Sequence, residues 1–270
     1  MPIAHINGGH LHYILEGQSN APALILSNSL GSNFGMWDSQ MPDFHKHFRV
    51  LRYDTRGHGQ SEVTPGPYSF DQLGRDVLAL ADEVDMGTFS FCGLSMGGVT
   101  GMWLGIHAPQ RLHRLVLCST GAKIGNAETW DARIDAARKS GTKSIAPVAM
   151  ERWFTKPFRD REPATIQRIQ HMVETTNLEG YVACCQALQA VDLREQIARI
   201  STPTLVISAT HDPATPPPDG QFVAQHIPNA RYLELDAAHL SNIEQQQIFT
   251  KEVSAFLRTH DQAKPHRQSL

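Results

Sequence analysis

Short apolar runs recur along the chain and predict buried β-strands. Six mostly apolar runs lack the alternation of a half-buried strand: residues 23–26, 50–53, 89–92, 115–118, 204–208 and 232–235. Strands that are buried on both faces have this pattern and belong to parallel sheets covered by helices. Ahead of them, residues 4–13 surround an Asn7-Gly8 pair, which predicts an antiparallel hairpin.

Segments with helical periodicity lie between these runs. Ser69 and Gln72 have the spacing of a capping box, and a helical apolar pattern follows them. Residues 245–258 carry a second amphipathic pattern. The apolar positions of the two segments are Phe70, Leu73, Val77, Leu80 and Val84, and then Ile248, Phe249, Val253, Phe256 and Leu257. Alternating strands and helices predict an α/β fold with a doubly wound, mostly parallel sheet.

Residues 122–194 break this alternation because they contain no strand-like run. Their helical patterns are interrupted at Gly141, Pro147, Pro157, Pro163 and Gly180. The stretch is too long for a simple crossover between strands. We therefore expect a helical cap over 122–194, inserted into a core of residues 1–121 and 195–260. Residues 261–270 are polar and without pattern, and we expect a frayed tail.

Composition and charge narrow the class of protein. The chain has 270 residues, of which 41% are hydrophobic and 19% charged, so it is neither disordered in bulk nor fibrous. A net charge of −3 with scattered Lys and Arg argues against a nucleic-acid partner or an anionic membrane surface. No run reaches the roughly 18 apolar residues of a membrane span, and the N-terminus lacks a secretory signal pattern. We expect a cytoplasmic protein.

The cysteines and histidines give no metal-site pattern. The four cysteines, Cys92, Cys118, Cys184 and Cys185, lack the paired spacing of zinc ligands. We expect them to be buried small side chains. Among fourteen histidines, His10 and His12 would share one face of a strand, but no third ligand lies nearby. We therefore expect no bound metal.

The sharpest chemical motif is Gly-Leu-Ser-Met-Gly at residues 93–97. It follows a predicted strand and opens a predicted helix, which is the context of a nucleophile elbow. Small flanking residues allow a tight turn that projects the Ser95 hydroxyl from the sheet. The alternative is a glycine-rich turn whose serine merely caps the helix.

A serine nucleophile requires a base and an acid that orients it, and in this architecture they follow in the order Ser, Asp or Glu, His. Asp212 follows the run 204–208, and His239 follows the run 232–235. Both therefore lie at the same sheet edge as Ser95, where open α/β sheets bind ligands. The alternatives are a turn-capping carboxylate for Asp212 and an exposed imidazole for His239. We interpret His211 as a neighbour of the acid.

Acyl transfer also requires donors for the developing oxyanion. The N–H of Met96, directly after the nucleophile, is one candidate. The second should come from the loop after the run 23–26, where Leu30 occupies the matching place. Each such donor is worth roughly 3 kcal/mol in the transition state.

Residues 54–61, Asp-Thr-Arg-Gly-His-Gly-Gln-Ser, resemble the D-x-R-G-x-G-x-S signature of α/β-hydrolases. With Ser95, Asp212 and His239 in order, this resemblance covers nearly the whole chain. It implies the α/β-hydrolase fold, with helices on a mostly parallel central sheet and an inserted helical cap. We interpret Arg56 and its neighbouring glycines as a structural loop.

More narrowly, the chain resembles the 3-oxoadipate enol-lactonase family. The similar segments are residues 26–31, 93–98, 210–217 and 239–244 in the core, and 122–125, 130–134 and 177–181 in the cap. This resemblance implies hydrolysis of 3-oxoadipate enol-lactone to 3-oxoadipate, in the β-ketoadipate pathway of aromatic degradation. The implied reaction uses a Ser-His-Asp triad and an acyl-enzyme, and no cofactor.

A lactone that carries a carboxylate requires a cation in the binding pocket. Trp130, Arg133, Ile134 and Ala137 share one face of a predicted cap helix. Arg133 is therefore a candidate to bind the substrate anion, and the alternative is a salt-bridged or snorkelling side chain. Trp130 and Trp153 are candidates to line the pocket, and packing of the cap onto the core is the alternative for Trp153.

Other activities share these motifs. A carboxylesterase, a perhydrolase or haloperoxidase, and a hydrolase of C–C bonds would use the same triad. A serine at position 95 excludes the dehalogenases and epoxide hydrolases, which use an aspartate nucleophile. A small-molecule receptor on this fold is the alternative outside the enzymes, because fold does not fix function. The oligomeric state does not follow from the sequence.

Overall fold

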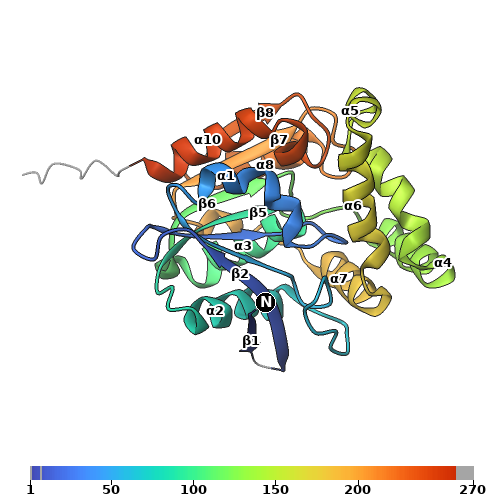
Figure 1. The fold of residues 1–270 in the computed structure, drawn as a ribbon, viewed down its shortest axis with the longest axis horizontal. Helices are drawn as coiled ribbons and strands as arrows, with labels where there is room; N and C mark the ends of the chain where they lie inside the picture. The colour runs from blue at the N-terminus through green and yellow to red at the C-terminus, as the bar shows by residue number, and fades with distance from the viewer. Residues whose placement is uncertain (1, 7, 260–270) are drawn as a thin grey trace, which may run out of the picture.

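The computed structural model describes residues 2–6 and 8–259. Within them, eight strands form one sheet in the order β1-β2-β4-β3-β5-β6-β7-β8 (Figure 1). β2 pairs antiparallel with both β1 and β4, and the other neighbours are parallel. The strands are β1 (Ile3–Ile6), β2 (Gly9–Glu16), β3 (Ala23–Ser27), β4 (Arg49–Tyr53), β5 (Phe89–Leu94), β6 (Leu112–Cys118), β7 (Thr204–Ala209) and β8 (Arg231–Leu235). The predicted α/β fold is confirmed, although Asn7 of the hairpin turn lies outside the described residues.

The central strands are buried on both faces, as their apolar runs predict. All residues of β5 and β7 are buried, because helices cover both sides of the sheet there. β8 is different. It is the last strand of the sheet, and Tyr232 on it is 36% exposed. The prediction of a buried strand at 232–235 is therefore wrong in its burial, because the sheet edge faces solvent.

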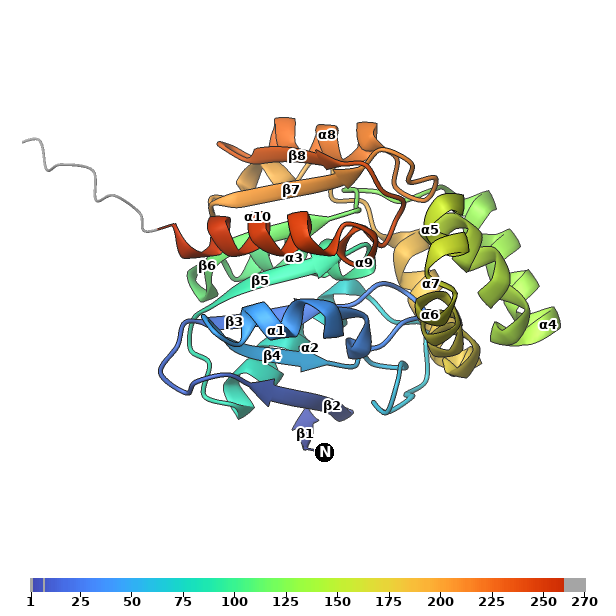
Figure 2. The same ribbon diagram turned by 45° about the horizontal axis from the view of Figure 1, so that its top comes forward.

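Helices pack on both faces of the sheet (Figure 2). α2 (Phe70–Glu83), α3 (Met96–His107) and α8 (Pro217–His226) cover one face, and α1 (Met41–Phe44) and α10 (Gln246–Arg258) cover the other. Ser69 caps the N-terminus of α2, and its Oγ accepts the Gln72 N–H at 3.1 Å. On α10, Phe249 is buried but Ile248 is 50% exposed, because one residue along a helix turns the side chain by about 100°. Ile248 was thus wrongly expected on the buried face.

Four further helices lie in the connections of the described chain. They are α9 (Ser241–Glu244) and the 3₁₀ helices η1 (Phe34–Gln40), η2 (Pro109–Arg111) and η3 (Ile197–Arg199). Of these, η1 is the first helix after β3, and it packs beside α1. Residues 28–33 form the loop that joins β3 to η1.

Helices α4 to α7 come between β6 and β7 in the sequence. They lie together beyond the ends of the strands (Figures 1 and 2). They are α4 (Ala127–Trp153), α5 (Lys156–Arg161), α6 (Pro163–Thr175) and α7 (Leu178–Ala190), and we call residues 127–190 the cap. Parallel strands β5, β6 and β7 point their carboxyl ends toward the cap (Figure 2). A cavity between the sheet edge and these helices is therefore where a ligand would bind.

The interruptions predicted within the cap are only partly correct. α4 kinks at Gly141, which adopts φ 72°, and prolines start α5 and α6, where the missing N–H breaks no bond. Pro147, in contrast, lies inside α4, and Gly180 lies in the first turn of α7. Neither ends a helix. Gly180 instead allows close packing on the core, since a Cβ there would collide with the backbone of Gly57.

The structure also bears on the expectations for the cysteines, for membrane spans and for metal sites. All four cysteines are buried and free, as expected. Among residues 2–6 and 8–259, no helix is long and apolar enough to cross a membrane, and no cluster of three His, Cys, Asp or Glu side chains is placed to hold a metal ion. The predicted frayed tail, residues 261–270, lies outside the described residues.

Candidate active site

Ser95 occupies the tight turn between β5 and α3. Its backbone is at φ 58° and ψ −113°, a strained conformation for a residue with a side chain. The turn is possible because glycines stand two residues before and two residues after Ser95: a Cβ on Gly97 would collide with the Ser27 carbonyl, and one on Gly93 with the Gly97 carbonyl. The Ser95 N–H donates to the Cys118 carbonyl at 2.8 Å, which ties the turn to β6. This is the geometry of a nucleophile elbow.

Asp212 and His239 are in direct contact. Asp212 follows β7 and His239 follows β8, and Asp212 Oδ2 lies 2.7 Å from Nδ1 of His239. The side chains are nearly inaccessible to solvent, at 0% for Asp212 and 2% for His239. A carboxylate at Nδ1 holds the proton of the neutral imidazole on that nitrogen, which leaves Nε2 as the acceptor.

The Asp212 carboxylate is held by a set of donors. Oδ1 accepts the N–H groups of Ala214 and Thr215 at 2.7 and 3.1 Å, and Oδ2 also accepts the Thr215 hydroxyl at 2.7 Å. Burial alone would raise the Asp212 pKa, but His239 and the Thr215 donors outweigh it and hold the pKa below its usual value. Asp212 therefore remains ionised beside the imidazole.

Ser95 and His239 open into one cavity of about 330 Å³ between the core and the cap. The core supplies these two residues together with Ser29, Leu30, Ala214 and Thr215, and the rest of the wall comes from the cap and from Ile124 and Gly125 just before it. The cap side chains that line the cavity include Trp130, Arg133, Ile145, Ala149, Arg152 and Trp153. The structure thus places Ser95, His239 and all three substrate-binding candidates on one cavity.

Arg133 enters this cavity without a carboxylate partner among residues 2–6 and 8–259. Its Nε donates to the hydroxyl of Tyr181 at 2.6 Å. The guanidinium carbon lies 5.4 Å from the Trp130 ring and 5.5 Å from the Tyr181 ring. The aromatic rings orient the guanidinium and leave its charge without a counter-ion. A salt-bridged Arg133, the alternative drawn from the sequence, is therefore not observed in the described chain.

The sequence reasoning missed a second cation, Arg152. It lines the same cavity, and in the described part of the chain no hydrogen bond or ion pair holds it. Burial and then the nearby charge of Arg133 lower the pKa of Arg152. The signal was present, since Ile145, Ala149 and Arg152 are spaced i, i+4 and i+7, the pattern that identified Arg133.

The two tryptophans have different surroundings. The Trp130 indole donates to the Ile124 carbonyl at 2.7 Å, so its ring is fixed at the cavity wall. The Trp153 ring centroid lies 6.2 Å from that of His239, with the planes 30° apart. Trp153 also packs in the buried cluster that joins cap and core. It therefore both lines the cavity and packs, so the two alternatives for this residue are compatible.

The candidate oxyanion donors lie on two adjoining segments. Leu30 belongs to the loop 28–31 after β3, and Met96 opens α3 directly after Ser95. The two segments are joined, because the Gly97 N–H donates to the Asn28 carbonyl at 3.0 Å. Within residues 2–6 and 8–259, neither the Leu30 nor the Met96 N–H has a protein acceptor. Leu30 lines the cavity together with Ser95, and Met96 is the residue directly after Ser95.

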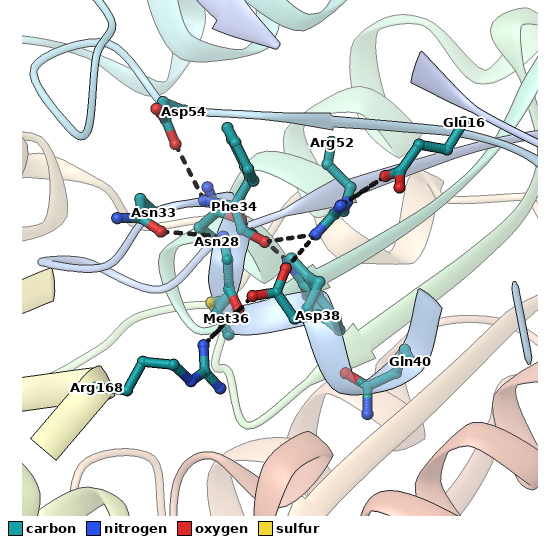
Figure 3. Close-up of polar contacts among 12 residues, drawn as sticks. Glu16, Asn28, Asn33, Phe34, Met36, Asp38, Gln40, Arg52, Asp54 and Arg168 are labelled. Atoms are coloured by element: carbon teal, nitrogen blue, oxygen red, sulfur yellow. Dashed lines mark hydrogen bonds and ion pairs between the residues drawn. The ribbon is translucent and has the colours of Figure 1, made fainter. Parts of the chain in front are cut away.

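The 3₁₀ helix η1 is fixed on both sides by arginines (Figure 3). Arg52 on β4 donates to Glu16 and to Asp38, each at 2.6 Å. From the cap, Arg168 donates to the Gly35 carbonyl at 3.0 Å. Polar contacts thus anchor the segment that continues the loop 28–31 to both the sheet and the cap.

Arg56 and His211, which the sequence analysis also considered, have contacts that hold loops and do not line the cavity. Arg56 is buried and forms a bidentate pair with Asp76, with both bonds at 2.7 Å, and it lies outside the cavity lining. His211 is exposed and contacts Asp236 at 2.8 Å. Arg56 therefore holds a loop, as expected, and His211 is a neighbour of the site.

Comparison with known proteins agrees with this geometry. A family model described as serine aminopeptidase, S33, matches residues 22–237. The chain is 45% identical to 3-oxoadipate enol-lactonase 2 of Acinetobacter baylyi, over 92% of this chain and 93% of that protein. It is 38% identical to 3-oxoadipate enol-lactonase 1 of the same organism, over 95% and 96%. The crystal structure of the enol-lactonase from Burkholderia xenovorans LB400 superposes with a TM-score of 0.94 at 47% identity, covering 96% of this chain and 100% of that one.

Proposed function

Because this chain belongs to the 3-oxoadipate enol-lactonase family of α/β-hydrolases, we propose that it hydrolyses 3-oxoadipate enol-lactone to 3-oxoadipate. This is a step of the β-ketoadipate pathway of aromatic degradation. The observation that carries the chemistry is the 2.7 Å contact of Asp212 with His239, on a cavity that also contains Ser95 at its strained turn. The substrate is a small anionic molecule, and neither a nucleic acid nor a membrane is among the proposed partners. We retain a cytoplasmic location as a prediction.

In the first half of the reaction, the Ser95 hydroxyl attacks the lactone carbonyl. His239 Nε2 takes the hydroxyl proton, and Asp212 stabilises the imidazolium. The carbonyl oxygen becomes an oxyanion between the N–H groups of Leu30 and Met96. Collapse of this intermediate breaks the ring C–O bond. The leaving oxygen departs as an enolate, which takes the proton that His239 holds and becomes a ketone, so its expulsion is easier than that of an alkoxide and His239 is neutral again.

In the second half, water resolves the acyl-enzyme. His239 removes a proton from the water, which attacks the Ser95 ester, and the same two N–H groups hold the second oxyanion. Release of Ser95 then gives the second carboxylate of the product. Every step uses a side chain, a backbone N–H or water, so the proposed reaction needs no cofactor.

We assign the substrate carboxylate to the cation pair Arg133 and Arg152. Both guanidinium groups line the cavity, and in the described chain neither has an anionic partner. Two cations without an ion-pair partner among the described residues, in a partly apolar cavity, favour a ligand with a negative charge. Trp130 and Trp153 supply the adjoining apolar wall.

The test is the loss of 3-oxoadipate enol-lactone, followed by absorbance, for the wild type and for Ser95→Ala. Ser119→Ala is the matched control, because this buried hydroxyl has no partner among the described residues. We expect rapid lactone turnover in the wild type and in the control, and none above background in Ser95→Ala. The wild type should hydrolyse a nitrophenyl ester only slowly. Fast ester hydrolysis with an inert lactone would contradict the substrate and move the protein to the esterases. Lactone turnover by Ser95→Ala would contradict the nucleophile.

A further inference from the structure

The loop 28–31 is held at every position around its candidate oxyanion donor. The Asn28 side chain donates to the Tyr53 carbonyl at 2.7 Å and accepts the Trp37 indole N–H at 3.0 Å. The Ser29 N–H donates to the sulfur of Met36 at 3.3 Å. The amides of Ser29 and Gly31, on either side of Leu30, both have acceptors, whereas the Leu30 N–H has none among the described residues. The Leu30 N–H is therefore flanked by two held amides.

The amide on the other side of Leu30 is held by a histidine. The Gly31 N–H donates to Nε2 of His58 at 2.9 Å. Since Nε2 accepts, the imidazole proton lies on Nδ1, which faces the Arg56 carbonyl at 3.3 Å. His58 is 1% exposed, and burial lowers its pKa to about 4. The imidazole is thus neutral near pH 7, as an acceptor for an amide must be.

The cap holds the opposite side of the same residue. The Thr176 hydroxyl, at the end of α6, contacts the Gly31 carbonyl at 3.1 Å. Gly31 itself is at φ 79°, a conformation that requires glycine. The Gly31 N–H bond to His58 holds the peptide plane after Leu30, and the Ser29 N–H bond to Met36 holds the plane before it. The peptide plane that carries the Leu30 N–H lies between these two held planes, so loss of either bond lets it turn.

We propose that His58 is a positioning residue that sets the direction of the Leu30 N–H by holding the N–H of Gly31. His58 does not touch the substrate. It acts on the oxyanion donor one residue away, so its effect is confined to tetrahedral species on Ser95. This role rests on the proposed function only through the use of Leu30 as an oxyanion donor.

Two variants separate acceptor position from loss of the ring. His58→Gln has an amide oxygen that reaches about as far as Nε2, whereas His58→Asn has the same group one methylene shorter. We expect kcat for the lactone to fall at least tenfold in His58→Asn, with KM within twofold, because an oxyanion donor is worth about 10²–10³ in kcat. We expect His58→Gln to retain kcat within about threefold. His107→Gln is the control, since it makes the same exchange in the last turn of α3, away from this loop, where the imidazole contacts the Trp103 carbonyl.

A second measurement is independent of the natural substrate. A small alkyl boronic acid adds to an activated serine and forms a tetrahedral anion, and its affinity is measured by calorimetry. We expect its Kd to rise in His58→Asn by the same factor by which kcat/KM for the lactone, or for a nitrophenyl ester, falls. If the lactone is inert but the boronate and ester follow this order, the proposed substrate fails and the role of His58 stands.

A folded His58→Asn protein with wild-type kcat and wild-type boronate affinity would overturn the proposed role of His58. So would equal losses in the Asn and Gln variants, because a purely structural imidazole would not distinguish the two amides. If His58→Asn does not fold, the His58→Gln variant decides alone, since loss of boronate affinity in that folded protein contradicts the role of the acceptor.

Discussion

Gly180 in the cap and Gly57 in the core meet backbone to backbone. A Cβ on either residue would collide with backbone atoms of the other. Gly57 adopts φ 77° in the loop that contains Arg56 and His58, and Gly180 lies in the first turn of α7. Contact between these two glycines sets how closely the cap approaches the sheet edge, and therefore the width of the cavity over Ser95.

This contact predicts that Gly180→Ala moves the cap. The added methyl has no space, so α7 must shift away from the core. We expect a loss of stability of about 1–3 kcal/mol, typical of overpacking, and a lower kcat/KM for the lactone. Gly87→Ala is the matched control, because a Cβ at Gly87 meets no atom within 4 Å. Urea unfolding and steady-state kinetics measure both effects, and a Gly180→Ala enzyme equal to the control would show that the contact does not constrain the cap.

The cation pair predicts charge-selective kinetics. We expect Arg133→Leu and Arg152→Leu each to lower kcat/KM for the anionic lactone by about 10–100-fold, since a hydrogen bond to a charged group is worth about 1.5–3 kcal/mol. Hydrolysis of a neutral nitrophenyl ester should change by less than about threefold. Arg138→Leu, on an exposed position of α4, removes the same charge outside the cavity and should leave both rates unchanged. Equal losses for the lactone and the neutral ester would refute carboxylate binding by the pair.

The Asp212–His239 contact predicts a large effect of a small substitution. Asp212→Asn keeps the shape of the side chain but no longer stabilises the imidazolium or the required tautomer. We expect kcat to fall by about 10⁴-fold with little change in KM, as in serine hydrolases with this triad. The control is Asp219→Asn, a neighbouring carboxyl whose pKa is raised by burial and then by the charge of Asp212. It should retain kcat within about threefold, and a modest loss in Asp212→Asn would argue that another group orients His239.

Burial of neutral His58 predicts a pH dependence of stability. Its pKa is about 4 in the folded protein and 6.5 in the unfolded chain. Above pH 6.5 both states carry the neutral ring. Between pH 6.5 and 4 only the unfolded state binds the proton, so the free energy of unfolding falls as the pH falls. The full loss is about 3 kcal/mol.

Urea unfolding at several pH values between 7 and 4 measures this loss. The difference between the wild type and His58→Gln isolates it, because the other titrating groups are common to both proteins. We expect the stability advantage of the wild type over His58→Gln to shrink as the pH is lowered from 6.5 to 4. Parallel stability curves for the two proteins would show that His58 does not titrate over this range.

Local patterns were sufficient wherever one short segment determines the outcome. The apolar runs predicted strands β3 to β8, and for the central strands β5 and β7 the reason holds along their whole length, because helices cover both faces of the sheet there. Ser95 was predictable because its strained turn requires glycines at fixed positions nearby. The chain order of Asp212 and His239 placed both at one sheet edge, since parallel strands end on the same side.

Only the tertiary structure decided the relationships between segments that are distant in the sequence. The exposure of β8 follows from its place at the edge of the sheet, which its own apolar sequence does not encode. In the sequence alone, Gly180 resembles a helix breaker. The structure shows that it contacts Gly57, more than a hundred residues earlier in the chain. Arg152 had the same helical spacing as Arg133, but a shared cavity depends on how α4 bends at Gly141. Likewise, the bond from Gly31 to His58 joins two loops whose separation is set by the packing of the whole sheet. Sequence pattern determined which elements form and which groups carry the chemistry, whereas close packing between elements determined how these groups face one another.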